Sequence, residues 1–222
     1  MTLALLQPVF SPNLYDLAVM LQADKVVLDD LETWSRKGRV HRALIRTPEG
    51  SSYIHIPVRT SDRDKPIKEV RIDQYSDWIT PLLRSLKFNY RNSLYFDFYE
   101  PEIESDFKEG NGYEYLFPFV IFLRKRLFRY LELDLADKER LASECREYDH
   151  DPDRFAINLG AEKLFQEHDS RHYQRQAEMR SEPEFSHPEY RQHFERFLPW
   201  CCAYDLLFQY GPESFKVIDL LH

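Results

Sequence analysis

The feature that most constrains the fold is a strand–helix–strand pattern at the start of the chain. Residues 2–6 form a short apolar run, which predicts a buried strand. Ser11 and Pro12 are typical of a helix start, and leucine and alanine then recur at helical spacing. Residues 25–28 predict a second buried strand. Strands joined by one helix within about 30 residues run parallel, so we predict a βαβ unit and an α/β fold.

The rest of the chain divides into a hairpin and a mainly helical second half. Residues 40–47 and 53–59 are β-rich and flank a turn, and residues 67–72 predict a further short strand. The predicted helices lie at residues 78–90, 94–107, 116–133, 137–147, 152–165 and 202–210, with a last one after Pro212. Gly211 stands where a helix-ending glycine is expected. We expect one domain over 1–222, with a sheet-rich half at 1–75 and a helical half at 76–222.

Composition excludes several classes of protein. The chain has 30 Lys and Arg against 38 Asp and Glu, a net charge of −8, which argues against a general nucleic-acid binder. Hydrophobic residues make up 43%, too many for a disordered chain. No apolar run approaches the roughly 20 residues of a membrane span. The three cysteines suggest no disulfide framework and the N-terminus resembles no export signal, so we expect a cytoplasmic protein.

Widespread catalytic signatures are absent from the sequence. It has no GxxxxGK[ST], GxGxxG, HExxH, CxxC or GxSxG motif, and the sequence leaves the cofactor unknown. His168 and His172 are four residues apart and would share a helix face, but no third metal ligand is fixed by spacing. A surface helix is the favoured interpretation, and no metal site is predicted. Cys202 begins a helix, where a packing or capping role is favoured over that of a nucleophile.

Polar residues follow both strands of the βαβ unit. Gln7 and Phe10 come after the first strand, and Asp29 and Asp30 come directly after the second. Parallel strands end at the same sheet edge, which is where open α/β sheets bind ligands. The two aspartates could hold a metal, act as a base or fix a hydroxyl, or they could be an acidic turn.

A basic segment follows the aspartates. Arg36, Lys37, Arg39 and Arg42 surround Gly38 and are accompanied by His41. In an acidic protein, such a run is typical of an anion site, because the guanidinium group suits phosphate or carboxylate and glycine lets the backbone approach. The alternative is a solvated loop.

Motifs in a fixed order resemble those of the WbqC-like protein family, and the resemblance spans most of the chain. The matching segments are Gln7–Pro12, Val26–Asp30, Val40–Arg42, Ile54–Val58, Lys68–Ile72, Trp78, Tyr190–Phe194 and Pro199–Glu213. The chain departs from the family pattern in four places, one of which is the shift of the basic segment's first arginine to Arg39. His41 replaces an asparagine, Leu82 replaces a histidine, and Cys202 replaces a serine. If that histidine is catalytic in the family, this chain is altered or inactive.

The resemblance implies a role in surface-polysaccharide (O-antigen) assembly. The implied activity is a transferase that modifies an amino sugar, carried as a sugar nucleotide or another phosphorylated small molecule, by acyl or aminoacyl transfer. In that hypothesis Gln7 and Phe10 line the cleft, and Asp29 or Asp30 acts as base. Arg36, Arg39 and Arg42 hold phosphate, and His41 assists proton transfer because its ordinary pKa lies near neutrality. The alternative is a non-catalytic binding or assembly protein of the same pathway, with an exposed apolar patch near residues 94–99.

Overall fold

The computed structural model describes residues 1–221 and contains the predicted βαβ unit. Strand β1 (Thr2–Leu6) is followed by helix α1 (Leu14–Gln22) and strand β2 (Lys25–Leu28), and the two strands pair in parallel. The helix begins later than predicted, because Asn13 rather than Ser11 is its N-cap. The Asn13 side chain accepts a hydrogen bond from the Asp16 backbone, and the Asp16 side chain accepts one from the Asn13 backbone, which forms a capping box.

Both halves of the chain contribute strands to one five-stranded sheet. Its order is β5-β2-β1-β6-β7, with every neighbouring pair parallel. The added strands are β5 (Glu139–Leu141), β6 (Lys163–Phe165) and β7 (Arg180–Ser181). The predicted helix at 137–147 is therefore wrong, and the one at 152–165 ends at Asn158, where α5 (Pro152–Asn158) stops. These strands are too short to show a period of two, so pairing with β1 and β2 decides their conformation.

The hairpin is confirmed, while the strand predicted at 67–72 is wrong. Strands β3 (Arg42–Thr47) and β4 (Gly50–His55) pair antiparallel around a tight turn. Residues Ile67–Glu69 form a 3₁₀ turn instead of a strand, and Arg71 and Ile72 each form only a single β-bridge. The apolar side chains of this segment are buried, but its backbone does not pair with a neighbouring strand. The sequence pattern is therefore that of a strand although no strand forms.

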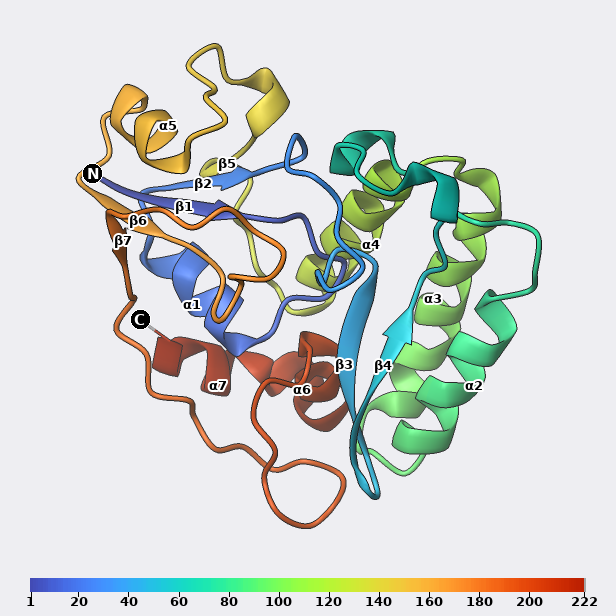
Figure 1. Cartoon of the computed structure of the whole chain (residues 1–222). Helices are drawn as coiled ribbons and strands as arrows, with labels where there is room; N and C mark the ends of the chain where they lie inside the picture. Colours follow the sequence, from blue (N-terminus) through green and yellow to red (C-terminus); the bar gives the residue numbers. More distant parts are fainter. Residues whose placement is uncertain (222) are drawn as a thin grey trace.

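Helices pack on both sides of the hairpin and confirm the α/β class (Figure 1). In the view of Figure 1, α2 (Ile79–Tyr90) and α3 (Phe96–Lys108) lie to its right, α4 (Leu116–Tyr130) lies behind its upper end, and α1, α6 (Ala203–Tyr210) and α7 (Phe215–Ile218) lie below the sheet. The remaining 3₁₀ turns are Thr60–Asp62, Glu109–Gly112, Ala142–Glu144, Gly211–Ser214 and Asp219–Leu221. One buried cluster joins α1, the hairpin, α2, α3, α4, α6 and α7 to the sheet, and a second, smaller cluster packs α5 against β1, β2 and β6. The single domain over 1–222 stays a prediction. Within residues 1–221, no helix has the length and apolar content needed to cross a membrane.

Gly211 ends α6 as predicted, and we expect its replacement by alanine to destabilise the fold. Its φ is +50°, and an added Cβ would lie 2.6 Å from ring carbons of Tyr95. Strain and overlap together should lower the free energy of unfolding by about 2 kcal/mol. Gly112→Ala is the matched control, because a Cβ there meets nothing within 4 Å. Urea denaturation measures both variants, and equal losses would contradict this account.

Candidate functional site

The order in which strands are added to the sheet reverses between β1 and β6. The loops at the carboxyl ends of these two strands therefore lead away from each other. From β1 the chain passes through α1 to β2 on one side, whereas β6 and β7 lie on the other side. Loops leaving such a pair of strands diverge and form a crevice, the usual ligand site of open parallel sheets. Two hydrogen bonds tie the loops together here. The Gln7 backbone donates to Glu167 Oε1 at 3.0 Å, and Gln7 Nε2 donates to the Tyr173 carbonyl at 2.8 Å.

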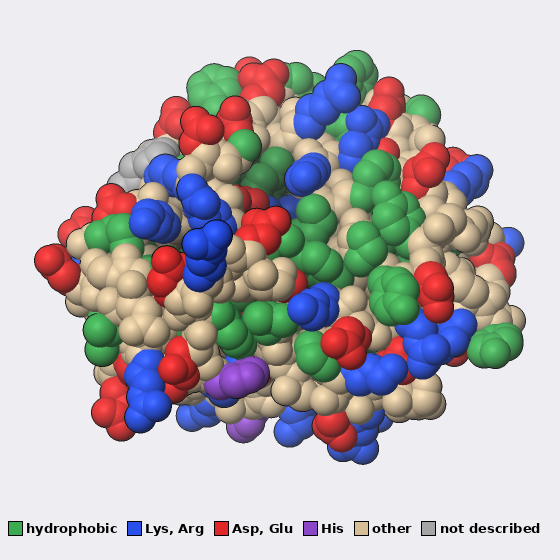
Figure 2. Space-filling view, turned by 90° about the horizontal axis from the view of Figure 1, so that it is seen from above, with side chains coloured by type: hydrophobic (Ala, Val, Ile, Leu, Met, Phe, Trp, Pro, Cys, Tyr) green, Lys and Arg blue, Asp and Glu red, His purple; other side chains and the backbone are tan. Residues whose placement is uncertain are grey.

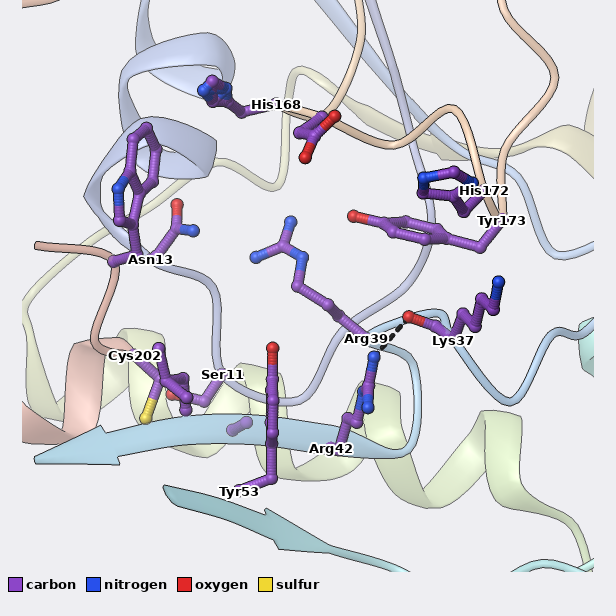
Figure 3. Close-up of a pocket in the computed structure, with 14 residues that line it drawn as sticks. Ser11, Asn13, Lys37, Arg39, Arg42, Tyr53, His168, His172, Tyr173 and Cys202 are labelled. Atoms are coloured by element: carbon purple, nitrogen blue, oxygen red, sulfur yellow. Dashed lines mark hydrogen bonds between the residues drawn. The ribbon is translucent and has the colours of Figure 1, made fainter. Parts of the chain in front are cut away.

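A cavity of about 590 Å³ lies at this crevice. It is lined by Ser11, Asn13, Lys37, Arg39, Arg42, Ala43, Leu44, Tyr53, His168, Asp169, His172, Tyr173, Trp200 and Cys202. In Figure 3 the Arg39 guanidinium lies near the middle, with the Tyr173 hydroxyl pointing toward it from one side and Asn13 on the other. The basic segment, the end of β1 and the loop after β6 thus meet around one space. We call this space the inner cavity.

A larger cavity of about 920 Å³ shares Lys37, His172 and Tyr173 with the inner cavity. Its charged lining is dominated by cations, which are Arg36, Lys37, Arg63, Arg171 and Arg175, against the acids Glu32 and Asp64. On the face seen from above, groups of basic and of acidic side chains are both scattered over the surface, with hydrophobic side chains across the middle (Figure 2). The cationic lining is therefore a local feature of a protein with mixed surface charge. We call this space the cationic cavity.

Arg39 is held by two buried carboxylates. Its Nη1 and Nη2 donate to Asp16, each at 2.7 Å, and its Nε and Nη2 donate to Glu167 at 3.2 and 2.8 Å. The Tyr173 hydroxyl also donates to Glu167. Burial raises the pKa of Glu167, an effect that the charge of Arg39 opposes. The guanidinium is thus largely occupied, which makes Arg39 a support for the crevice rather than a free phosphate ligand.

The other predicted basic residues have separate environments. Arg42 donates to the backbone carbonyls of Gly38, at 2.9 Å, and of Lys37, while its guanidinium lies 4.3 Å from the Tyr53 ring centre. Arg36 is exposed and lines the cationic cavity. Arg42 therefore shapes the loop around Gly38, and Arg36 is free to meet a ligand.

His41 lines the cationic cavity but does not titrate near neutrality. Its ring packs edge-on against Trp34 at 5.2 Å, and it is 7% exposed. Burial lowers the pKa of His41 to about 4, and the nearby charge of Arg42 contributes to the shift. The sequence-based premise of an ordinary pKa is therefore wrong, and at neutral pH the ring is uncharged.

The acid pair lies at the predicted sheet edge but does not line either cavity. Asp30 is buried and accepts a hydrogen bond from the Ser143 backbone at 2.9 Å. Asp29 lies behind the cationic cavity, with Oδ2 3.8 Å from Nη2 of Arg175. Phe10 is fully buried and packs edge-on against Phe107, so its ring belongs to the core. The cavities are therefore lined by the basic segment, whereas Gln7, Phe10 and the two aspartates, all predicted to form the cleft, are buried and line neither cavity.

Asp29 should make stability depend on pH near neutrality. Burial raises the pKa of Asp29 to about 7, and the negative charge of Glu32 adds to the rise. Because this pKa lies above its unfolded value, the stabilising contribution is present at low pH and is lost as the pH rises toward 7. We expect Asp29→Asn to raise the free energy of unfolding by about 2 kcal/mol at about pH 8 and to change it little at about pH 5. Urea denaturation at both values tests this, and equal destabilisation at both would contradict it.

Several cavity residues were not predicted as site residues. His168 and His172 lie in an irregular loop rather than on a helix, and both line the inner cavity with Asp169. Within residues 1–221, no group of three or more potential ligands is arranged for a metal ion. Burial raises the pKa of the Cys202 thiol to about 11, so this cavity residue is protonated at neutral pH. The charged, histidine-rich stretch after residue 166 was a sequence signal, but only β6 places it at the crevice.

Comparison with protein families adds one match. The model of the WbqC-like protein family matches residues 7–217. The chain belongs to this family. The matched range contains Gln7, the basic segment and the loop after β6, so the family resemblance covers the whole crevice. No curated protein and no solved structure matches the chain.

Proposed function

We propose that this WbqC-like protein is a transferase that modifies an amino sugar, carried as a sugar nucleotide, in surface-polysaccharide biosynthesis. Family membership supports the pathway, and the inner and cationic cavities support a ligand that has both a polar ring and a phosphate group. Their position at the carboxyl edge of a parallel sheet is the usual place for such a ligand.

The observation that carries the proposal is the unpaired positive charge of the cationic cavity. Arg36, Lys37 and Arg63 line it, and none of them forms an ion pair with a carboxylate within residues 1–221. Arg171 and Arg175 are paired, with Asp169 and Glu32 respectively. Unpaired cations around a concave surface favour a dianionic group such as a diphosphate. Lys37 also lines the inner cavity, so a sugar attached to that diphosphate would extend into it.

Acyl or aminoacyl transfer needs a base as well as a phosphate site. The sugar amine attacks the acyl carbon, a C–N bond forms, the donor's leaving group departs, and the base takes the amine proton. A pKa of about 7 suits Asp29 to proton exchange near neutrality, but the residue lines neither cavity and Arg175 separates it from the cationic cavity, so the sugar amine cannot deliver its proton to Asp29 directly. Asp30 keeps the role of holding the backbone at Ser143.

The alternative, a non-catalytic assembly protein, has one observation in its favour. Phe88, Leu94 and Phe98 are 68%, 77% and 66% exposed, in or beside the segment where an apolar patch was predicted. Exposed apolar side chains of this size are typical of contact surfaces. Turnover separates the two functions, because the assembly protein would bind a partner through α2 and α3 and would release no product from a sugar nucleotide.

We expect the double variant Arg36→Ala/Lys37→Ala to bind uridine diphosphate about tenfold or more weakly than the wild type, about 1.4 kcal/mol or more. Two charge-assisted contacts to phosphate are lost, whereas neither side chain supports the core. Isothermal titration calorimetry with uridine diphosphate and with a uridine diphosphate sugar measures the change. Arg84→Ala/Arg91→Ala on exposed positions of and beside α2 is the matched control, since it removes the same charge away from both cavities. Equal affinity of the two double variants would overturn the phosphate site.

A further inference from the structure

A third cavity, of about 790 Å³, adjoins the inner cavity through His168, Asp169 and Trp200. Its lining combines aromatic rings, from Tyr15, His168, Phe185 and Trp200, with polar groups from Gln176 and Glu182. We call it the aromatic cavity. The proposed transfer chemistry does not use it, although it continues the path that runs from the cationic cavity through the inner one.

The wall between the inner and aromatic cavities is built from backbone in an uncommon conformation. Trp200 has φ +73° and Asp169 has φ +48°. For a bulky residue such as tryptophan this left-handed region costs about 1 kcal/mol or more, whereas aspartate tolerates it better. The Trp200 amide donates to Nε2 of His187 at 3.3 Å, and its ring lies 4.4 Å from that of His168. The fold therefore holds a strained tryptophan at a fixed place between two cavities, and strain of this kind concentrates at ligand sites.

The charges of the aromatic cavity are paired with one another. Arg180 bonds Glu182 at 2.7 Å, and Arg171 bonds Asp169 at 2.8 Å. Glu182 also accepts a hydrogen bond from the Tyr15 hydroxyl. The aromatic cavity thus offers no net charge to a ligand, in contrast to the cationic cavity. It offers donors and acceptors side by side, which suits hydroxyl groups that both donate and accept.

We propose that the aromatic cavity is a subsite for an uncharged pyranose ring, with Trp200 as the platform on which the ring's apolar face packs. The C–H face of a pyranose is flat and apolar, while its hydroxyls point outward toward groups such as the Arg180–Glu182 pair. The proposal deepens the proposed function and rests on it for the sugar class of the ligand. It adds a sugar-binding subsite beyond the amino sugar held in the inner cavity.

The three tryptophans allow the two proposals to be tested separately. Trp200 lines both the aromatic and the inner cavity, Trp34 lines the cationic cavity, and Trp78 is buried against Phe119. Labelling the whole protein with 5-fluorotryptophan gives one ¹⁹F resonance per tryptophan, assigned with Trp34→Phe, Trp78→Phe and Trp200→Phe variants. Titration uses methyl pyranosides of glucose, galactose and N-acetylglucosamine up to tens of millimolar, with sorbitol as the acyclic polyol control and uridine diphosphate as the phosphate probe.

We expect the pyranosides, and not sorbitol, to shift the Trp200 resonance saturably even when a uridine diphosphate sugar occupies the inner cavity, which Trp200 also lines, while the Trp78 resonance stays fixed. A Trp200 resonance that no pyranoside moves, or that sorbitol moves equally, overturns the subsite. If uridine diphosphate shifts the Trp34 resonance while the pyranosides leave the Trp200 resonance unchanged, the proposed function stands and only the subsite is overturned. If the pyranosides shift the Trp200 resonance while uridine diphosphate leaves the Trp34 resonance unchanged, the result supports the subsite and contradicts the phosphate site. The shifts are read in the wild-type sequence, so a variant that fails to fold affects the assignment only.

Discussion

Arg39→Ala is expected to lower the free energy of unfolding by about 3–5 kcal/mol, because it leaves two buried carboxylates without their cation. Asp16 and Glu167 are each 1% exposed, and Arg39 contributes four hydrogen bonds to them. The loss should be smaller in acid. In the variant the pKa of a carboxyl deprived of its cation lies above its unfolded value, so stability is kept at low pH and lost as the pH rises. Urea denaturation at acid and neutral pH measures both effects.

Two further variants identify the cause of that loss. Arg36→Ala removes a charge from the same basic segment at an exposed position, and it should change stability by no more than about 0.5 kcal/mol. Arg39→Met/Glu167→Gln keeps most of the buried volume and removes one of the stranded charges, so it should recover part of the stability that Arg39→Ala loses. If Arg39→Ala were as stable as Arg36→Ala and instead failed to bind uridine diphosphate, Arg39 would be a phosphate ligand rather than a support.

Asp205→Ala is expected to lower the free energy of unfolding by about 3 kcal/mol or more, because Asp205 joins three segments from within the core. It is fully buried in α6. Its Oδ1 accepts from the Tyr90 hydroxyl at 2.9 Å, and its Oδ2 accepts from the Tyr190 hydroxyl at 2.7 Å and from Gln192 Nε2 at 3.0 Å. Removal of the carboxylate leaves buried donors without their acceptor.

Two control variants are compared with Asp205→Ala: one keeps the shape of the Asp205 side chain, and the other removes an exposed acid. Asp205→Asn keeps one acceptor oxygen and should cost less than Asp205→Ala, about 1–2 kcal/mol. Glu102→Ala removes an exposed acid from the middle of α3 and should cost no more than about 0.5 kcal/mol. Thermal and urea unfolding compare the three variants. A loss in Asp205→Ala no larger than that in Glu102→Ala would show that the residues around 190 are held to α6 by other contacts.

The sequence predicted that the basic segment lies at the carboxyl edge of the sheet, but it did not show which of its residues are free and which are bonded within the protein. The basic segment does line two cavities at the carboxyl edge of the sheet, next to Gln7. From the sequence, Arg36, Arg39 and Arg42 were all predicted to bind phosphate. In the fold, Arg36 is exposed, Arg39 is held by Asp16 and Glu167, and Arg42 is bound to the backbone. Glu167 is 128 residues away from Arg39, so no local pattern could show that its charge is already balanced.

Tertiary contacts also decided which other groups reach the site. Asp29 follows β2 as predicted, yet Arg175 stands between it and the cationic cavity. Trp200 and His168 meet across 32 residues of chain, and neither carries a local motif that would predict a stacked wall. Side chains of this kind become a site only when β6 and α6 place their loops side by side.

The sequence by itself determined the βαβ unit, the hairpin and the long helices. These elements bury a face through contacts within a few residues, and a period of two or 3.6 records that burial in the order of the side chains. Only the tertiary structure decided that residues 139–141, 163–165 and 180–181 are strands. A strand of two or three residues has almost no local preference, and its hydrogen-bond partners lie on β1, β2 or β6. The sheet edge that carries the cavities depends on those distant partners, which is why the site is complete only in the folded chain.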